Sequence, residues 1–88
     1  MSYEIEWTAS ALRELRKLDK QTGRKIAVAV TALGTDPRPP GCRALAGQPA
    51  GVMRIRIGDH RVVYQVVDSR VLVTVVRVAH RREVYRNM

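Results

Sequence analysis

The sequence predicts a small α+β domain in which a pair of helices packs on one face of a twisted antiparallel sheet. Three observations support this fold class. A short alternating segment begins the chain, two segments with helical periodicity follow, and beyond a proline-rich connector the apolar residues recur at every second position. With 88 residues, of which 45% are hydrophobic, there is room for one core, so we expect residues 1–88 to form a single domain.

The N-terminal half contains a strand followed by a helical hairpin. Residues 3–7 alternate between apolar and acidic side chains, which is typical of a strand. Thr8 or Ser10 then caps a first helix, residues 19–23 interrupt the helical pattern, and a second helix ends at Gly34. The residues expected to face inward are Tyr3, Ile5 and Trp7 in the strand, Ala11, Leu12, Leu15 and Leu18 in the first helix, and Ile26, Ala27, Val30 and Leu33 in the second.

The C-terminal half predicts a meander of strands. Residues 36–41 contain three prolines, which lack a backbone donor, so this segment is a connector. The strands that follow are rich in Val and Ile, and short turns at Gly58-Asp59 and Asp68-Ser69 join them. The expected strands are residues 52–57, 60–67 and 71–79, with a further short strand within residues 43–47 and a helical turn or tail at residues 81–86.

Positive charge is concentrated in the second half of the chain. The formal net charge is +8; residues 1–40 hold 7 basic and 5 acidic side chains, whereas residues 41–88 hold 9 and 3. Each of those nine basic residues is an arginine, whose planar fork suits phosphate. A basic excess can serve solubility alone, but this distribution favours a polyanionic partner, above all RNA.

Composition also restricts the compartment and the chemistry. The single Cys42 excludes an internal disulfide and fits a reducing compartment. The first residues lack the basic and apolar regions of a signal peptide, and no apolar run approaches the ~20 residues of a membrane span, so we expect a cytoplasmic protein. Two histidines and one cysteine without clustered carboxylates match no known ligand spacing, so we expect neither a metal ion nor a cofactor.

An arginine cluster is the most informative pattern in the chain. Alternation within residues 52–57 sends Arg54 and Arg56 to one face of a strand. If Gly58-Asp59 is a two-residue hairpin loop, Arg56 lies directly opposite Arg61. Like charges in that arrangement destabilise a sheet unless an anion lies between them, although strand arginines can also be solvated side chains that cover apolar surface.

The register of the next hairpin stays open. Asp68-Ser69 is either the whole loop or part of a three-residue loop, and the choice decides which face Arg77 occupies. We interpret Arg77 as structural. Tyr64 lies on the face opposite Arg61, so we interpret it as a core residue with its hydroxyl at the rim rather than as a catalytic phenol.

Two segments carry a family resemblance. Residues 54–66 (RIRIGDHRVVYQV) and residues 78–85 (VAHRREVY) resemble the core of the RelE toxins of bacterial toxin–antitoxin pairs, and the likeness extends over nearly the whole chain. The resemblance implies a protein that enters the ribosomal A site and cuts messenger RNA there without a metal ion. In that reaction the ribose 2′-oxygen attacks the adjacent phosphate and leaves a cyclic phosphate and a 5′-hydroxyl. It also implies an antitoxin partner of the RelB type.

The same resemblance implies roles for individual residues. Arg54 and Arg56 stand where the family has basic groups, commonly Lys, near the nucleophile. Arg61 matches the family's phosphate-binding arginine. Arg81 matches, with a gap in the alignment, a second arginine near the leaving group, and Tyr85 matches the C-terminal tyrosine that stacks on or orients the substrate.

Further RNA contacts are expected from arginines around this set. The RNA-binding residues we predict are Arg43, Arg54 and Arg82. Some members of the family carry an arginine just before a glycine in the region of residues 43–47, and Ala46 occupies that place here. Arg43 is the residue that can compensate for it.

Proton transfer is the part of the chemistry that the arginines do not supply. Arginine does not lose its proton in proteins, so Arg54 and Arg56 are not general bases. His80 and His60 are the available candidates, and we hypothesise that His80 assists because a neighbouring arginine favours the neutral imidazole. The alternative is charge stabilisation with little base catalysis, in which the ribosome supplies strain and position.

Two other functions compete with the ribonuclease. One is a ParE-like inhibitor that binds DNA gyrase and has no nuclease chemistry. The other is a catalytically inactive member that serves only as an antitoxin-bound repressor subunit, an alternative kept open by the arginines at positions where lysine is usual. Fold alone does not separate these functions, so the site must do so.

Overall fold

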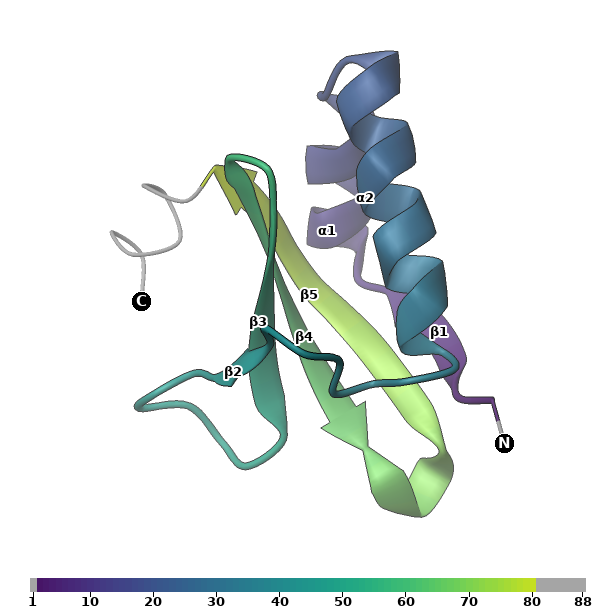
Figure 1. Ribbon diagram of the computed structural model, residues 1–88, viewed down its shortest axis with the longest axis vertical. Coiled ribbons are helices and arrows are strands. Elements are labelled where there is room, and N and C mark those ends of the chain that lie inside the picture. Colours follow the sequence, from purple (N-terminus) through teal and green to yellow (C-terminus); the bar gives the residue numbers. More distant parts are fainter. Residues whose placement is uncertain (1, 81–88) are drawn as a thin grey trace.

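The computed structural model describes residues 2–80 and confirms the α+β fold class. The predicted helical turn at residues 81–86 lies outside this range. Helices α1 and α2 run in opposite directions and lie on the same side of one sheet (Figure 1). In chain order the elements are β1 (Glu4–Trp7), α1 (Ala9–Arg16), α2 (Lys20–Leu33), β2 (Arg43–Ala44), β3 (Val52–Ile57), β4 (His60–Val67), a 3-10 turn (Asp68–Arg70) and β5 (Leu72–His80).

The sheet within residues 2–80 has five strands in the order β1-β5-β4-β3-β2. The β2–β3, β3–β4 and β4–β5 pairs are antiparallel, as expected for a meander. However, β1 runs parallel to β5, so the sheet is mixed rather than wholly antiparallel. The alternation of residues 3–7 predicts a strand but carries no information about its neighbour, and two helices separate β1 from the rest of the sheet.

Side-chain caps set the first residue of each helix. The hydroxyl oxygen of Thr8 accepts a hydrogen bond from the backbone N–H of Ala11 at 3.1 Å, which assigns the first cap to Thr8 rather than Ser10. The carboxylate of Asp19 accepts from the N–H of Thr22 at 3.1 Å and begins α2 at the predicted break. Because both caps satisfy donors that a helix terminus leaves unpaired, the hairpin is bounded where the sequence predicts.

Gly34 ends α2 for a reason other than the one predicted. Its φ of −64° is an ordinary helical value, so no left-handed conformation requires glycine there. Instead, a Cβ at Gly34 would lie 3.0 Å from the carbonyl oxygen of Tyr3. The Gly34 carbonyl accepts a hydrogen bond from the Tyr3 N–H at 2.7 Å, so the absence of a side chain lets the end of α2 approach β1 closely.

The main core lies between the helices and the sheet. Tyr64 is fully buried in it, as predicted, and its hydroxyl donates to the carbonyl oxygen of Pro37 at 2.8 Å. Burial raises the pKa of Tyr64 well above its ordinary value. Several residues that we expected to face inward are only partly buried. Leu12 and Ala27 are among them. The others pack against this core, and they are Tyr3, Ile5, Trp7, Leu15 and Leu18. The buried members of this core are Ala11, Ile26, Val30, Leu33, Val62, Tyr64, Val66, Val73, Val75 and Val78.

The opposite face of the sheet carries a smaller apolar cluster and no helix of the described chain. In this cluster Val63 and Ala79 are buried, and Leu45, Val52 and Val76 pack against them. A β-bulge interrupts the pairing of β4 with β5, because Val63 pairs with Arg77 whereas the next residue, Tyr64, pairs with Val75. We call this face of the sheet the open face.

The two hairpins differ in how closely they follow the prediction. Ile57 pairs with His60 around Gly58-Asp59, which confirms the two-residue loop, and Gly58 has the positive φ (61°) that a type II′ turn needs. In the next hairpin Val67 pairs with Leu72, so the loop has four residues rather than two or three.

Neither described helix has the length and hydropathy of a membrane span.

Candidate nucleic-acid interface

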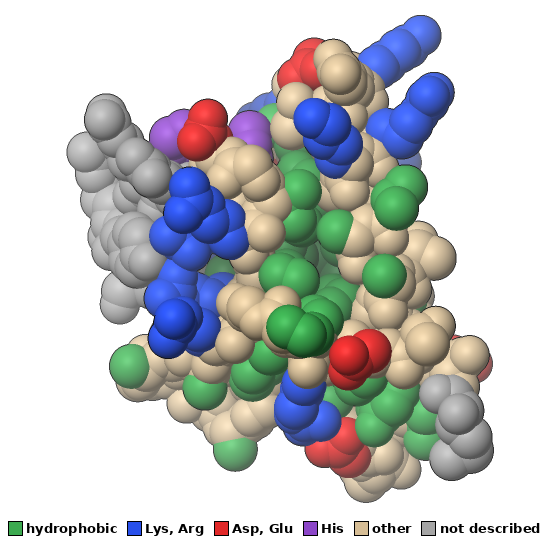
Figure 2. All heavy atoms as spheres, viewed as in Figure 1, with side chains coloured by type: hydrophobic (Ala, Val, Ile, Leu, Met, Phe, Trp, Pro, Cys, Tyr) green, Lys and Arg blue, Asp and Glu red, His purple; other side chains and the backbone are tan. Residues whose placement is uncertain are grey.

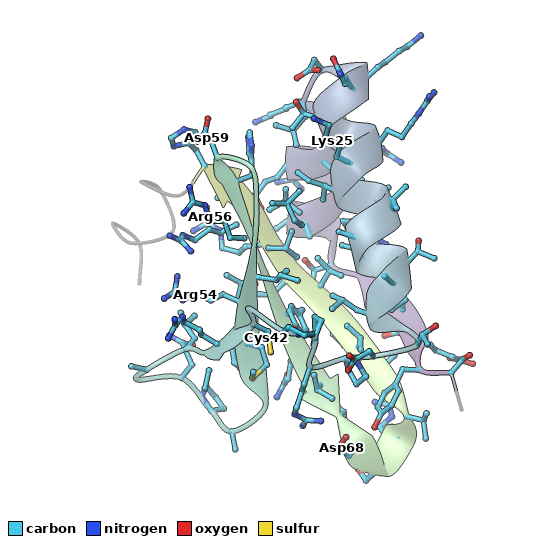
Figure 3. The ribbon with its side chains drawn as sticks, viewed as in Figure 1. Lys25, Cys42, Arg54, Arg56, Asp59 and Asp68 are labelled. Carbon is cyan, nitrogen blue, oxygen red and sulfur yellow. The ribbon has the colours of Figure 1, made fainter. Side chains whose placement is uncertain are left out.

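Four arginines meet on the open face as two cross-strand pairs. Arg43 of β2 lies opposite Arg54 of β3, and Arg56 of β3 lies opposite Arg61 of β4. Cross-strand partners point to the same face, and so do residues two apart on one strand. All four side chains therefore belong to the open face, and Arg54 and Arg56 point away from the helices in Figure 3.

The local sequence of β3 forces this arrangement. Met53, Ile55 and Ile57 pack against the main core, and the residues between them must point the other way. The tight Gly58-Asp59 turn then fixes the register that brings Arg61 opposite Arg56. Alternation and turn chemistry were sufficient to predict this pair.

The arginines line one shallow hollow of about 200 Å³. Its lining residues, among those described, are the four arginines and Gly41, so no carboxylate of residues 2–80 lines it. Figure 2 shows their blue side chains gathered at the left, on the side of the sheet away from the helices. A hollow lined in this way concentrates positive potential and suits an anion with several oxygen acceptors, such as a phosphate group.

Burial differs between the members of this arginine cluster. Arg54 and Arg61 are half-buried, whereas Arg43 and Arg56 are exposed at the rim. The Nε of Arg56 donates to the carbonyl oxygen of Gly58 at 3.1 Å, which holds its stem along the turn. Directly opposed like charges destabilise a sheet by up to ~1 kcal/mol per pair. Two such pairs in one hollow therefore favour an anion as occupant.

The two histidines lie elsewhere. His60 pairs with both Ile57 and His80, so the two imidazoles share the helix side of the sheet, and their ring centroids are 5.7 Å apart in an edge-to-face arrangement. They line a separate hollow of about 280 Å³ with Glu14, Lys17 and Leu18 of the helical region. The structure therefore does not bring His80 together with the arginines.

Arg77 has the structural role that we predicted, through a partner that the sequence did not indicate. Its Nη2 donates to the Glu14 carboxylate at 3.1 Å, and both side chains are largely covered. The second carboxylate oxygen of Glu14 accepts from the backbone N–H of Val78 at 2.9 Å. The bulge in β5 and this ion pair direct Arg77 to α1, away from the arginine hollow.

Comparison with known proteins identifies the family. Residues 5–85 match the family model described as the ParE toxin of the type II toxin–antitoxin system parDE. The chain belongs to the RelE/ParE toxin superfamily. This toxin is 31% identical over 87 residues to the toxin RelG of Mycobacterium tuberculosis, covering 98% of this chain and 99% of RelG. It is 32% identical over 88 residues to the mRNA interferase toxin RelE of Escherichia coli, covering 97% of this chain and 92% of RelE.

Solved structures of this superfamily share the fold. The toxin–antitoxin complex RelBE2 from Mycobacterium tuberculosis gives a TM-score of 0.81 at 26% identity, and the match covers 91% of this chain and 92% of that one. The type II toxin described here therefore has the RelE-like arrangement of two helices on a five-stranded mixed sheet.

The structure describes part of the site that the resemblance implies for this toxin. Arg43, Arg54, Arg56 and Arg61 come together, and Gly41 is a lining residue that the sequence did not single out. The predicted residues Arg81, Arg82 and Tyr85 lie outside the described range. Within residues 2–80 there is no group of three or more His, Cys, Asp or Glu side chains that could hold a metal ion.

Proposed function

We propose that this type II toxin is an endoribonuclease that cuts messenger RNA in the ribosomal A site. The observation that carries the proposal is the hollow lined by Arg43, Arg54, Arg56 and Arg61, without a carboxylate among its described lining residues. An RNA phosphodiester is an anion whose oxygens can accept hydrogen bonds from several of these guanidinium groups. The similarity to the mRNA interferase RelE over nearly the full chain supports the same activity.

In the proposed reaction the arginines act on charge. The 2′-oxygen of one ribose loses its proton and attacks the adjacent phosphorus, the bond from phosphorus to the 5′-oxygen of the next nucleotide breaks, and that oxygen gains a proton. The products are a 2′,3′-cyclic phosphate and a 5′-hydroxyl. Arg56 and Arg61 stabilise the negative charge that develops on the phosphate oxygens, so the proposed mechanism uses no metal ion. One well-placed donor to a developing oxyanion contributes about 3–4 kcal/mol.

The rest of the proposed site lies at the end of the chain. By resemblance, Arg81 neutralises the leaving oxygen and Tyr85 orients the substrate, with Arg82 as a further RNA contact. His80 directly precedes Arg81, which keeps it as a candidate for proton transfer although it lines a different hollow. If His80 transfers a proton, the pH profile of single-turnover cleavage changes in His80→Ala; matching profiles would leave charge stabilisation as the main effect.

The second candidate function is inhibition of DNA gyrase. It is favoured by the matching family model, whose description names the ParE toxin. The arginine hollow favours the ribonuclease, because inhibition by binding alone does not require several guanidinium groups around one anion site. The relatives RelG and RelE also carry RelE-type names.

The proposed partners are the ribosome with its messenger RNA and an antitoxin of the RelB type. The related RelBE2 structure is a toxin–antitoxin complex, which supports the second partner. An antitoxin helix with acidic residues near the arginine hollow would complement its charge, and its apolar side would pack on the partly buried Leu45, Val52 and Val76 of the open face. All of these partners place the toxin in the cytoplasm.

Primer extension on messages from cells induced to express the toxin tests the proposal. Cuts within translated codons are expected for the wild type and for Arg70→Gln, an exposed arginine in the β4–β5 loop, but not for Arg61→Gln. Intact messages together with loss of gyrase supercoiling activity would instead identify the gyrase inhibitor.

A further inference from the structure

We propose that the arginine hollow is a double subsite that binds two successive phosphates of one RNA strand. The pair Arg56/Arg61 holds one phosphate, and the pair Arg43/Arg54 holds its neighbour. The assignment of the cut phosphate to Arg56/Arg61 rests on the proposed nuclease function. The binding of two phosphates rests only on the arrangement of the four guanidinium groups.

The spacing of the pairs fits this reading. Arg54 and Arg56 are two residues apart on β3, a rise of about 6.6–6.8 Å along the strand. The pair Arg43/Arg54 joins β2 and β3, whereas the pair Arg56/Arg61 joins β3 and β4. The two pairs are therefore also offset sideways by one strand spacing, about 4.7–4.9 Å. This diagonal step resembles the separation of neighbouring phosphates on a nucleic-acid strand, and long arginine side chains can adjust to it.

Charge balance also favours two anions over one. Four guanidinium groups line one hollow, and its described lining holds no carboxylate that offsets them. A single phosphodiester carries one negative charge, so it can lie between the guanidinium groups of only one cross-strand pair. A second phosphate of the same strand relieves the second pair, and the two groups are already joined covalently.

Arg43 completes the second phosphate subsite, because it supplies the guanidinium group opposite Arg54. It lies on the two-residue edge strand β2, which follows the proline-rich connector. The N–H of Leu45 donates to the carbonyl oxygen of Val52 at 3.0 Å and extends the pairing of this short strand with β3. Arg43 is therefore held opposite Arg54 at the exposed rim, where it can contact a phosphate without contributing to the core.

The test compares RNAs that differ by one phosphate. Full-length toxin is titrated with a 2′-O-methyl dinucleotide, which has one phosphodiester, and with a 2′-O-methyl trinucleotide, which has two; neither can be cleaved. Wild type is expected to bind the trinucleotide at least about tenfold more tightly than the dinucleotide, because the second phosphate adds at least one charge-assisted hydrogen bond. Arg43→Gln should bind both RNAs with the affinity that wild type has for the dinucleotide. The matched control Arg70→Gln should retain the difference.

Salt dependence gives a second readout. For single strands the slope of log K against log salt is about −0.7 per neutralised phosphate, so Arg43→Gln should make the trinucleotide slope shallower by about 0.7. Equal binding of both RNAs by wild type, a difference that survives in Arg43→Gln, or binding of neither RNA at low salt would each overturn the double subsite. Neither measurement requires cleavage. If the toxin distinguishes the two RNAs but cuts no message, the double subsite is supported and the proposed nuclease function is wrong.

Discussion

Glu14 of α1 accepts a hydrogen bond from the backbone N–H of Val78 in β5 at 2.9 Å. Strand β1 pairs with β5 only as far as Val75, so the edge of β5 beyond that residue has no neighbouring strand in the described sheet. The Glu14 carboxylate supplies the missing acceptor and also binds Arg77 at 3.1 Å. One side chain thus covers the edge of β5 and holds Arg77 away from the arginine hollow.

Removal of this carboxylate should destabilise the fold. Glu14→Ala leaves the Val78 N–H and the Arg77 guanidinium without their acceptor, and the side chains of the ion pair are only 25% and 23% exposed. We expect the free energy of unfolding in urea to fall by about 1–3 kcal/mol. Glu4→Ala, an exposed glutamate of β1, is the control and should cost less. Equal losses in the two variants would mean that Glu14 does not support the β5 edge.

The loop before β3 depends on a glycine that approaches β4. Gly51 has a φ of +89°, and a Cβ there would lie 2.7 Å from the carbonyl oxygen of Val66. Gly47 also has a positive φ (77°), but its Cβ would meet nothing within 4 Å. Both alanine variants carry the backbone strain of about 1–3 kcal/mol, and only Gly51→Ala adds a collision. Thermal unfolding should therefore occur at a lower temperature for Gly51→Ala than for Gly47→Ala; the reverse order would contradict this contact.

The arginine pairs should make stability and activity change in opposite directions. Arg56→Gln removes one of two directly opposed charges, so at low salt its free energy of unfolding should rise by up to ~1 kcal/mol, and less at high salt. RNA cleavage should fall in the same variant. Urea unfolding and a cleavage assay on one preparation give both values, with Arg70→Gln as control. A loss of stability with unchanged cleavage would assign Arg56 a structural role instead.

A hydrogen-bonded surface network at the other end of the sheet should make the free energy of unfolding fall at acid pH. Asp68 accepts from the two terminal nitrogens of Arg38, Nη1 at 3.3 Å and Nη2 at 2.9 Å, and from the hydroxyl of Tyr3 at 2.7 Å. The Arg38 hydrogen bonds, followed by that of Tyr3, lower the pKa of Asp68 below its ordinary value. The stabilisation from this lowered pKa is therefore complete above the unfolded-state pKa of about 4 and is lost as the pH falls through the folded-state value.

Asp68→Asn tests this network. The variant should be less stable than wild type at pH 7, and the difference should shrink as the pH falls below about 4, where the wild-type carboxylate gains a proton. Urea unfolding across this pH range measures the difference, and Asp59→Asn, a turn residue, is the charge-matched control. A difference that persists unchanged at low pH would show that the Asp68 charge is not the stabilising feature.

The sequence predicts most of the fold because its local signals agree. The cap at Thr8, the break at residues 19–23, the two-residue turn at Gly58 and the alternation of β3 each act over a few residues, and the structure follows them. The Arg56–Arg61 pair follows from these local rules alone. The parallel β1–β5 pairing does not, because it joins segments more than sixty residues apart and depends on packing rather than on pattern.

The parts of the site that sequence reasoning missed depend on register. The four-residue loop after Val67 and the bulge beside Val63 set which face each residue of β5 occupies, and neither has a clear sequence signal. Val71, at the end of that loop, adopts a φ of +50°, which a β-branched residue rarely does. As a result, the position of His80 on the helix side could not be predicted from the sequence. The pairing of Arg43 with Arg54 depends instead on the register of β2 with β3, which the turn chemistry of the sequence did not indicate.

Single-turnover cleavage of a message held in the ribosomal A site tests the central claim most directly. Wild-type toxin and Arg70→Gln should cut at the same rate and leave a 2′,3′-cyclic phosphate. Arg61→Gln should cut about 10²–10³-fold more slowly, because it removes a donor to the developing negative charge. An unchanged rate in Arg61→Gln, or an uncut message with wild type, would contradict the claim that the arginines of the open face bind the scissile phosphodiester.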